Sequence, residues 1–280
     1  MLPISVIILT KNEEAAIRDC IAAVPWAAEV FVVDSSSTDK TAQIARQMGA
    51  TMVSFSWNGE YPKKKQWALD NVPAKHDWVL LLDADEVAQP ELPRHLAEVI
   101  DETSGGGPYG AADIEFDYEW QGRLLKHGHR VVKRSLVQRT RCRFPVVDDL
   151  SVASMWEVEG HYQPQTHLPV RRIPAGIIHR DPDPASQWFS RHNRYSDWEA
   201  HVVTSGQRAE IAGARSRGGR LFARVPFKAV AFFLYSFVVQ RGFLDGRAGF
   251  DYALAQSFYY WQIELKIREI QRTAEGIERQ

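Results

Sequence analysis

The sequence predicts an α/β fold with a mainly parallel sheet, and three observations carry this prediction. Short apolar runs rich in β-branched residues alternate with helix-forming segments over the first hundred residues, as they do where crossover helices join parallel strands. Polar clusters follow three of these runs, at the strand ends where such sheets bind ligands. The composition, 45% hydrophobic and 25% charged over 280 residues, is that of a globular chain and excludes disordered, collagen-like and coiled-coil classes.

The individual elements follow from residue type and spacing. The unbroken apolar run over 4–9 predicts a strand covered on both faces. Before residue 90 we expect strands over 4–9, 30–33, 51–55 and 78–82, and helices after Asn12, over 40–48 and over 64–71. Beyond the glycine-rich loop at 104–108, alternating residues predict antiparallel strands over 111–120 and 130–138, and a helix is expected over 188–201.

The cysteines and the N-terminus indicate a cytoplasmic protein. Cys20 and Cys142 are too few for a disulfide scaffold, and their spacing does not suit a zinc finger, so a reducing compartment is expected. The first residues lack a basic segment and turn polar after nine positions, which predicts a first strand rather than a signal peptide. A pI near 6.8 argues against a nucleic-acid partner.

The sequence Asp83-Ala84-Asp85 ends the apolar run over 78–82. Two carboxylates one residue apart at a strand end can bind a hard divalent cation, which prefers oxygen ligands, and such a cation neutralises a diphosphate leaving group. The alternative is a solvated strand-to-helix turn in which Glu86 is an acid at the start of a helix.

A nucleotide site is expected at two neighbouring strand ends. Asp34 directly follows the second strand, where a carboxylate can accept a hydrogen bond from a ribose hydroxyl or a base N–H. Thr10 and Glu13 follow the first strand. The alternative for Asp34 is a residue that stabilises its own turn. The sequence has no GxGxxG or Walker loop, which disfavours dinucleotide and P-loop chemistry.

Four segments in order resemble the family 2 glycosyltransferases: ISVIILTKNEE (4–14), VVDSSSTD (32–39), KKKQWAL (63–69) and LLDADE (81–86). The resemblance implies a GT-A fold with a mixed, mainly parallel sheet, a nucleotide-sugar donor (UDP being the commonest), a divalent metal (Mg²⁺ or Mn²⁺) and inversion at the anomeric carbon. It implies that Thr10, Glu13 and Asp34 bind the nucleoside, that the run Lys63 to Lys65 lies near the base and phosphates, and that Asp83 and Asp85 bind metal and ribose.

Later segments are similar to the lipopolysaccharide-core β-glucosyltransferase subfamily: WFSRHNRYSDWEA (188–200), RVPF (224–227) and QRGFLDGRAGF (240–250). That subfamily carries a His-Glu pair thought to supply the catalytic base. Here His161-Tyr162 stands at the corresponding place, so the carboxylate is displaced. The candidates for the base are Glu159, then Glu157, with His161 and Asp149 also open; an inverting transfer needs one such group near the acceptor hydroxyl. The alternating Glu157-Val158-Glu159 is expected to put both acids on one strand face.

His179 follows two isoleucines and is a candidate third metal ligand, since imidazole commonly binds transition metals. The alternatives are a structural histidine and a hydrogen-bond donor to the diphosphate.

The expected domains are a GT-A domain over 1–210 and a helical, membrane-associating extension over 211–280. Residues 211–244 include six basic side chains and no acid (Arg215, Arg217, Arg220, Arg224, Lys228 and Arg241). The mostly apolar segment 225–239, with Phe227, Phe232, Phe233, Tyr235 and Phe237, is too short to span a bilayer easily and suits an interfacial element. The alternatives are a buried helix and a homodimer face. Leu254, Phe258, Trp261 and Leu265 recur at helical spacing and are expected to be packing surface.

These features together predict an inverting hexosyltransferase on the inner face of the cytoplasmic membrane. It would move a sugar from a nucleotide-diphosphate donor to a glycan or glycolipid acceptor such as a lipopolysaccharide core. One alternative is a nucleotidyltransferase, which is expected to have a glycine-rich basic loop after the first strand; Thr10-Lys11-Asn12-Glu13 is not such a loop. The other is a non-catalytic nucleotide-binding protein on the membrane face.

Overall fold

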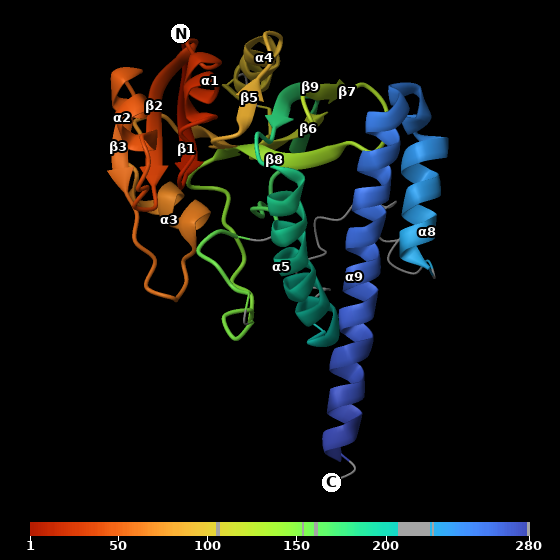
Figure 1. Ribbon diagram of the computed structural model, residues 1–280. Coiled ribbons are helices and arrows are strands. Elements are labelled where there is room, and N and C mark those ends of the chain that lie inside the picture. Colours follow the sequence, from red (N-terminus) through yellow and green to blue (C-terminus); the bar gives the residue numbers. More distant parts are fainter. Residues whose placement is uncertain (105–106, 153, 160–161, 207–224, 226, 279–280) are drawn as a thin grey trace.

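A computed structural model describes the chain except for residues 105–106, 153, 160–161, 207–224, 226 and 279–280. One mixed sheet organises the described residues, with the strand order β3-β2-β1-β4-β8-β6-β9-β5 and β7 paired to β6. Helices lie against the sheet, and a long C-terminal helix runs beside it and beyond it (Figure 1). The predicted α/β class is therefore confirmed.

The first four strands form the parallel half of the sheet. These are β1 (Leu2–Thr10), β2 (Ala27–Asp34), β3 (Thr51–Ser54) and β4 (Trp78–Asp83). In β1, β2 and β4 the register pairs Thr10 with Asp34 and Leu9 with Asp83, so that three strands end together. This alignment brings the polar clusters of the sequence to one edge of the sheet, as predicted.

Alternating side chains of these strands supply two hydrophobic cores. Ile4 and Ile8 pack on one face with α1 (Ile17–Ala22), α2 (Thr41–Gln47) and α4 (Leu92–Ser104). Ile7 and Leu9 pack on the other face with α3 (Lys64–Asn71) and α5 (Ala185–Thr204). Burial on both faces explains why the strands read as unbroken apolar runs.

The second half of the sheet is mixed. Strand β8 (Val131–Gln138) runs antiparallel to β4 and to β6 (Ala111–Trp120), whereas β9 (Val170–Arg180) runs parallel to β6. Two short strands complete it, β7 (Arg123–Leu125) and β5 (Glu86–Ala88). Strand β5 replaces the strand-to-helix turn considered for Glu86, and it pairs Glu86 directly with His179 of β9.

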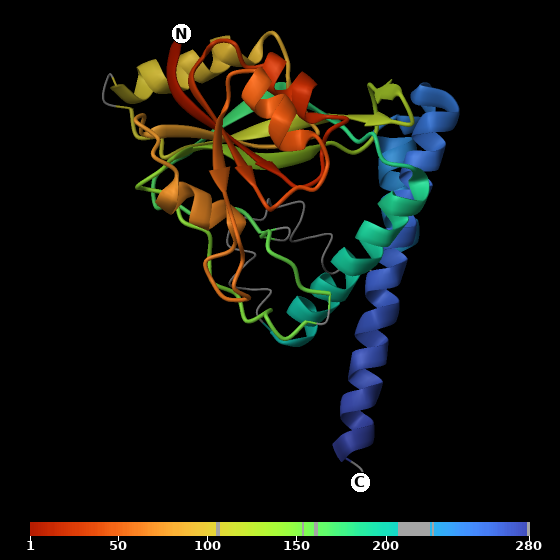
Figure 2. The same cartoon turned by 60° about the vertical axis from the view of Figure 1, so that its left-hand side comes forward.

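The C-terminal residues form a helical pair. Helix α8 (Lys228–Phe233) continues into the π-helical η2 (Leu234–Val239), and η3 (Gly242–Asp245) turns the chain into α9 (Gly246–Glu278). Helix α9 packs against both α8 and α5, and α5 lies beside it in both views (Figures 1 and 2). Trp120 and Leu125 of the sheet join Trp188 and Tyr252 in a third core that holds this pair to the domain.

Three expectations for this region meet the structure differently. The proposed boundary between 210 and 211 and the arginines at 215, 217, 220 and 224 lie outside the described residues. The aromatic side chains of 225–239 do not all face outward, because Phe232 is 3% exposed and Phe233 and Phe237 pack on Phe250. Within the described residues, no helix combines the length and apolar character needed to cross a bilayer.

Candidate active site

One large cavity lies at the carboxyl ends of β1 and β4. Its volume is about 1710 Å³, and its walls include Thr10, Glu13, Asp83 and Asp85 from the first half of the chain. Helices α5, α8 and α9 close its other side with residues such as Tyr195, Phe232 and Tyr259. The polar strand ends therefore face a chamber that the C-terminal helices help to build.

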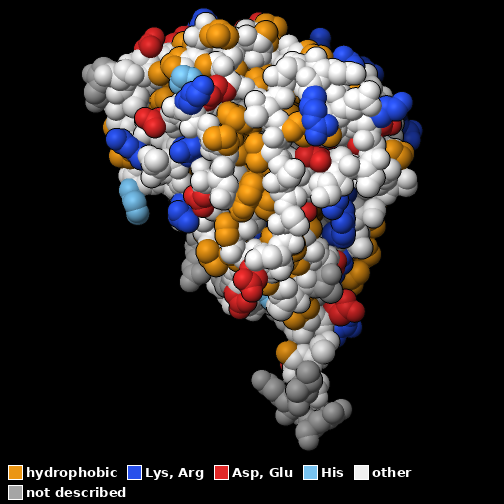
Figure 3. Space-filling model, turned by 90° about the vertical axis from the view of Figure 1, so that its left-hand side faces the viewer, with side chains coloured by type: hydrophobic (Ala, Val, Ile, Leu, Met, Phe, Trp, Pro, Cys, Tyr) orange, Lys and Arg blue, Asp and Glu red, His pale blue; other side chains and the backbone are white. Residues whose placement is uncertain are grey.

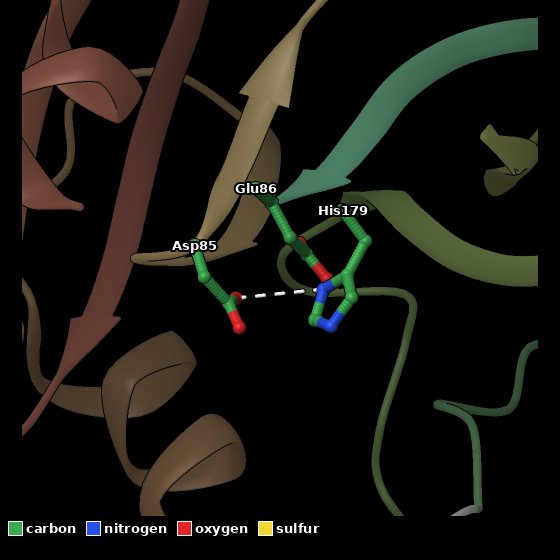
Figure 4. A group of neighbouring side chains, drawn as sticks. All are labelled: Asp85, Glu86 and His179. Atoms are coloured by element: carbon green, nitrogen blue, oxygen red, sulfur yellow. Dashed lines mark ion pairs between the residues drawn. The ribbon is translucent and has the colours of Figure 1, made fainter. Parts of the chain in front are cut away.

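A cluster of three metal-binding side chains lies in this cavity. Asp85 follows β4, Glu86 begins β5 and His179 is near the end of β9, and each offers a ligand atom within 4.8 Å of the others (Figure 4). His179 Nδ1 lies 3.6 Å from Asp85 Oδ1 and has no hydrogen-bond partner among the described residues although it is buried. Burial raises the pKa of the Asp85 carboxyl, and nearby Asp83 adds to the rise.

This donor set fits a divalent cation. Carboxylate oxygens suit Mg²⁺ and Mn²⁺, and an imidazole nitrogen is accepted by the latter. A cation would also relieve the repulsion among acids that are buried side by side. Of the three metal ligands predicted from the sequence, Asp85 and His179 belong to the cluster. The third member is Glu86 and not the predicted Asp83.

Asp83 instead lies between two lysines. Lys65 Nζ and Lys133 Nζ are each 3.5 Å from its carboxylate oxygens. Burial opposes ionisation of Asp83, but the two lysines outweigh it and hold the pKa of its carboxyl well below the ordinary value. Lys133 also pairs with Glu86. Asp83 is thus an ionised acceptor in the cavity wall, next to the cluster.

The three consecutive lysines at the start of α3 point in different directions. Lys63 is buried, pairs with Asp149 at 2.8 Å and is not among the residues that line the cavity; its place near the base and phosphates stays a prediction. Lys64 donates to the carbonyl of Thr10. Of the three, Lys65 pairs with Asp83, the acid next to the metal-binding cluster.

The predicted nucleoside residues lie close together but in unlike surroundings. The Thr10 hydroxyl is buried in the cavity wall without a hydrogen-bond partner among the described residues. Glu13 lines the cavity, and burial together with Asp85 raises the pKa of its carboxyl to about 8. Asp34 accepts hydrogen bonds from the amide and hydroxyl of Ser37, so the self-stabilised turn considered for it is present.

The four candidates for the catalytic base differ in burial and in the hydrogen bonds that their side chains accept. Both carboxylate oxygens of Glu159 accept backbone N–H groups of α3, from Lys65 at 2.7 Å and Gln66 at 2.8 Å. Burial raises the pKa of Glu159 although these bonds oppose the rise. Asp149 is fully buried and accepts from Lys63, Tyr61 and Trp198. His161 lies outside the described residues.

Glu157 is placed differently from Glu159. Its side chain is 17% exposed, lines the cavity, and lies 3.6 Å from Lys64 Nζ and 4.0 Å from Lys11 Nζ. Its backbone carbonyl accepts the N–H of Lys64 at 2.8 Å, so the loop is fixed to α3 while the carboxylate stays in the cavity. The strand expected here is absent, because described residues 154–159 form turns and loop.

Comparison with known proteins identifies the family. The model of the family described as glycosyl transferase family 2 matches residues 5–157, which is more than half of the chain. The chain belongs to glycosyl transferase family 2. Together with the observed sheet, this confirms the resemblance drawn from the sequence and the GT-A type of α/β fold.

Individual relatives cover less of the chain. An uncharacterized glycosyltransferase of Rickettsia bellii is 48% identical over 90 residues, which are 32% of this chain and 30% of the relative. The lipopolysaccharide core biosynthesis glycosyltransferase LpsC of Rhizobium meliloti is 35% identical over 104 residues, 35% of this chain and 37% of LpsC. The matched part is thus about a third of these curated relatives.

Solved structures resemble the chain at low sequence identity. S. aureus TarS is 16% identical, with a TM-score of 0.43 over 80% of this chain and 46% of that one. Glucosyl-3-phosphoglycerate synthase of Mycobacterium tuberculosis, in complex with Mn²⁺, UDP and glucosyl-3-phosphoglycerate, is 17% identical, with a TM-score of 0.40 over 69% of this chain and 77% of that one.

In this family 2 chain, sequence reasoning missed several residues of the cavity. Lys133, which pairs with Asp83 and Glu86, gave no local signal because β8 is brought to β4 only by the sheet. Arg191 of α5 pairs with Asp181 and Asp183, in the loop that follows β9. Tyr118 packs its ring 4.9 Å from that of His179. The signal for Glu86 was its position directly after the Asp83-Ala84-Asp85 triplet.

Proposed function

We propose that the chain is an inverting, metal-dependent hexosyltransferase. It transfers a sugar from a nucleotide-diphosphate donor, with UDP as the first candidate, to a hydroxyl of a glycan or glycolipid. The observation that carries the proposal is the cluster of Asp85, Glu86 and His179 in a cavity beside the strand-end residues Thr10 and Glu13. Membership of family 2 supports the reaction class.

Each residue has a proposed part in donor binding. Asp85 and His179 bind the metal, which when bound neutralises charge on the diphosphate. Glu86 completes the cluster from β5. The Thr10 hydroxyl and the Glu13 carboxyl bind the nucleoside, and Asp34 shapes the same strand end through its turn. Lys65 and Asp83 form the wall toward the phosphates and ribose.

We assign the base to Glu157 ahead of Glu159, reversing the order favoured by the sequence. A base must accept the acceptor's hydroxyl proton, and the Glu159 oxygens already accept two backbone N–H groups. In the reaction the proton passes to a Glu157 oxygen and the freed acceptor oxygen bonds to the anomeric carbon. On the opposite side of that carbon, the bond to the diphosphate breaks and the diphosphate leaves with its electron pair.

The proposed acceptor is a membrane-associated glycan, and a lipopolysaccharide core is the leading example. Similarity to LpsC over a third of each chain supports this class. The basic residues of 211–244 support an anionic membrane surface as partner, and the proposed location is peripheral, on the inner face of the cytoplasmic membrane.

A thermal-shift panel tests the donor assignment. Nucleoside diphosphates are added with Mn²⁺ or with EDTA, because a ligand that binds the native state raises its melting temperature. We expect UDP with Mn²⁺ to give the largest shift, and hydrolysis of the matching sugar nucleotide to require Mn²⁺. The variant Asp85→Asn, which lacks a charged metal ligand, is measured in the same panel. Its matched control is Asp101→Asn, on the exposed surface of α4. Binding without hydrolysis or transfer would instead favour a non-catalytic nucleotide-binding protein.

A further inference from the structure

Aromatic side chains gather on one wall of the cavity. Trp188, His192 and Tyr195 line the cavity from one side of α5, because residues three and four apart share a side of a helix. The His192 ring lies 3.6 Å from that of Trp188 and 5.5 Å from that of Tyr195. Trp156 adds a fourth ring from a loop, 5.0 Å from the Tyr195 ring. We call these four side chains the aromatic wall.

Hydrophobic packing does not account for Trp156 and Tyr195. Neither belongs to any of the three hydrophobic cores of the described residues, whereas Trp188 belongs to the third. Both are half-buried in the cavity wall. On the outer surface shown in Figure 3, by contrast, hydrophobic side chains lie scattered among charged side chains of both signs. Aromatic rings that gather inside a cavity beside a few polar groups are typical of a ligand pocket.

The loop that carries Trp156 is fixed on both sides. The Ser154 hydroxyl donates to the backbone carbonyl of Arg194 on α5 at 3.2 Å. The backbone carbonyl of Glu157 accepts the N–H of Lys64 on α3 at 2.8 Å. Trp156 lies between these two anchors, and the carboxylate of the next residue, Glu157, is the proposed base. Because both side chains line the cavity, a molecule held on the Trp156 ring lies near the group that would take its proton.

Tyr195 lies toward the proposed donor site. Burial raises the pKa of its hydroxyl, Arg191 opposes the rise, and the charges of Asp83 and Asp85 add to it. Tyr195 is therefore within electrostatic reach of the acids at the end of β4, where the diphosphate and sugar of the donor are proposed to bind. The aromatic wall thus extends from the proposed base to the proposed donor site, which is where an acceptor has to lie.

A sugar ring is the ligand that suits this wall. The face of an aromatic ring is negative. In a pyranose with equatorial hydroxyls, the C–H bonds point to the two faces of the ring and carry weakly positive hydrogens, so one face can stack while the hydroxyls point sideways. Glu199, on the same side of α5, also lines the cavity, and carboxylate oxygens accept hydrogen bonds from such hydroxyls. A nucleobase stacks on rings too, but the residues proposed for the nucleoside follow β1 and not α5.

We propose that Trp156 and Tyr195 form the acceptor subsite, where a pyranose ring of the glycan stacks with one hydroxyl directed at Glu157. The inference rests on the proposed function and deepens it, because it gives the acceptor of that transfer a place and a chemistry. The subsite takes a sugar that has one ring face free of axial hydroxyls, since an axial hydroxyl on that face would hold the sugar away from the aromatic rings.

Saturation-transfer NMR with methyl β-D-glucopyranoside tests the subsite. The glycoside is added in excess to the protein with UDP and Mg²⁺, and saturation of the protein should pass mainly to the glycoside hydrogens on one face of its ring. Trp156→Ala should bind the glycoside about tenfold more weakly, which is the scale of an aromatic stacking contact. Tyr195→Leu should give a similar loss. Trp156→Phe keeps a ring and should retain most of the binding.

The matched control is Trp261→Ala. Trp261 is 43% exposed on α9 and is not among the residues that line the cavity, so its loss should leave glycoside binding unchanged. The rest of its stripe, Leu254, Phe258 and Leu265, is exposed as well, so the packing predicted for the stripe from the sequence is not filled within the described residues. Melting temperatures show whether each variant is folded, and calorimetry measures its affinity for UDP with Mn²⁺, which should equal that of the parent protein.

Three results would overturn the proposal. One is no saturation transfer from the parent protein to the glycoside. Another is equal glycoside binding in Trp156→Ala and Trp261→Ala. The third is loss of UDP binding in Trp156→Ala, which would show that this ring stacks on the base of the donor. If the parent protein binds the glycoside but shows no metal-dependent binding or hydrolysis of a sugar nucleotide, the proposed function fails while the sugar subsite is supported, so the two failures are distinguishable.

Discussion

The strand-end cluster and the C-terminal helical pair are built in opposite ways. Around Asp85 and His179, charged groups are buried and held by sheet register and ion pairs that join distant parts of the sequence. Along α8 and α9, apolar side chains such as Leu254 are exposed on regular helices. Both features lower the stability of the fold. The first buries charge, and the second leaves apolar surface in water. Such local conflicts are expected at functional sites.

The largest effect is expected from Asp85→Asn. The amide keeps the shape of the side chain but removes a charged metal ligand, so transfer and donor hydrolysis should fall to background. The substitution should not lower the melting temperature of the EDTA-treated protein, because it removes a carboxyl whose charged form is disfavoured by burial and by nearby Asp83. Steady-state assays across a Mn²⁺ titration provide the measurement. Activity that is unchanged by EDTA in the parent protein would contradict the metal assignment.

The next effect separates the two glutamates of the loop. Glu157→Gln should lower turnover by about 10²–10⁴, the usual contribution of a general base, with UDP binding unchanged. Glu159→Gln should mainly lower stability, because one of the two backbone N–H donors then faces an amide NH2 group, which cannot accept its hydrogen bond, and the other donates to an uncharged oxygen. Comparing kcat and the melting temperature in both variants decides the order. Normal turnover in Glu157→Gln with none in Glu159→Gln would restore the order that the sequence favoured.

The same two glutamates show where sequence reasoning stops. The strand ends at Thr10, Asp34 and Asp83 were predictable because buried parallel strands read as apolar runs followed by polar residues. The partners of Glu159 were not, since nothing local indicates that a loop carboxylate binds the start of a helix more than ninety residues earlier.

Pairings across the sheet were hidden for the same reason. Glu86 opposes His179 only because β5 folds back on β9, and Lys133 reaches Asp83 from β8. On α9, the apolar stripe was visible in the sequence, but periodicity states which residues share a side and not what covers that side.

A third prediction concerns the buried ion pair between Lys63 and Asp149, which links the start of α3 to the loop that contains Asp149. Lys63→Met leaves Asp149 charged and fully buried, so the free energy of unfolding should fall by about 3–5 kcal/mol. Lys75→Met is the control, because that lysine is 84% exposed in a surface pair and should cost less than about 1 kcal/mol. Urea denaturation followed by tryptophan fluorescence measures both. Equal midpoints in the two variants would rule out the pair as the anchor.

The smallest effect is a change in pH dependence at Glu13. Burial raises the pKa of this carboxyl from 4.5 to about 8 in the folded chain, so the folded state binds its proton more tightly than the unfolded state. Its contribution to stability is fully present below pH 4.5 and is lost as pH rises to about 8. In EDTA, the melting temperature of the parent protein should therefore fall as the pH rises from 4.5 to about 8. Glu13→Gln should remove this part of the fall. Parallel profiles for parent and variant would show that Glu13 titrates normally.

Calorimetric titration of UDP tests the central claim, that Asp85 and His179 form a metal-dependent donor site. The parent protein should bind UDP at least about tenfold more tightly with Mn²⁺ than with EDTA, a coupling in the usual range for linked ligands. Asp85→Asn should abolish that difference, whereas Asp101→Asn should keep it. Equal UDP affinity with and without Mn²⁺ in the parent protein would contradict the account.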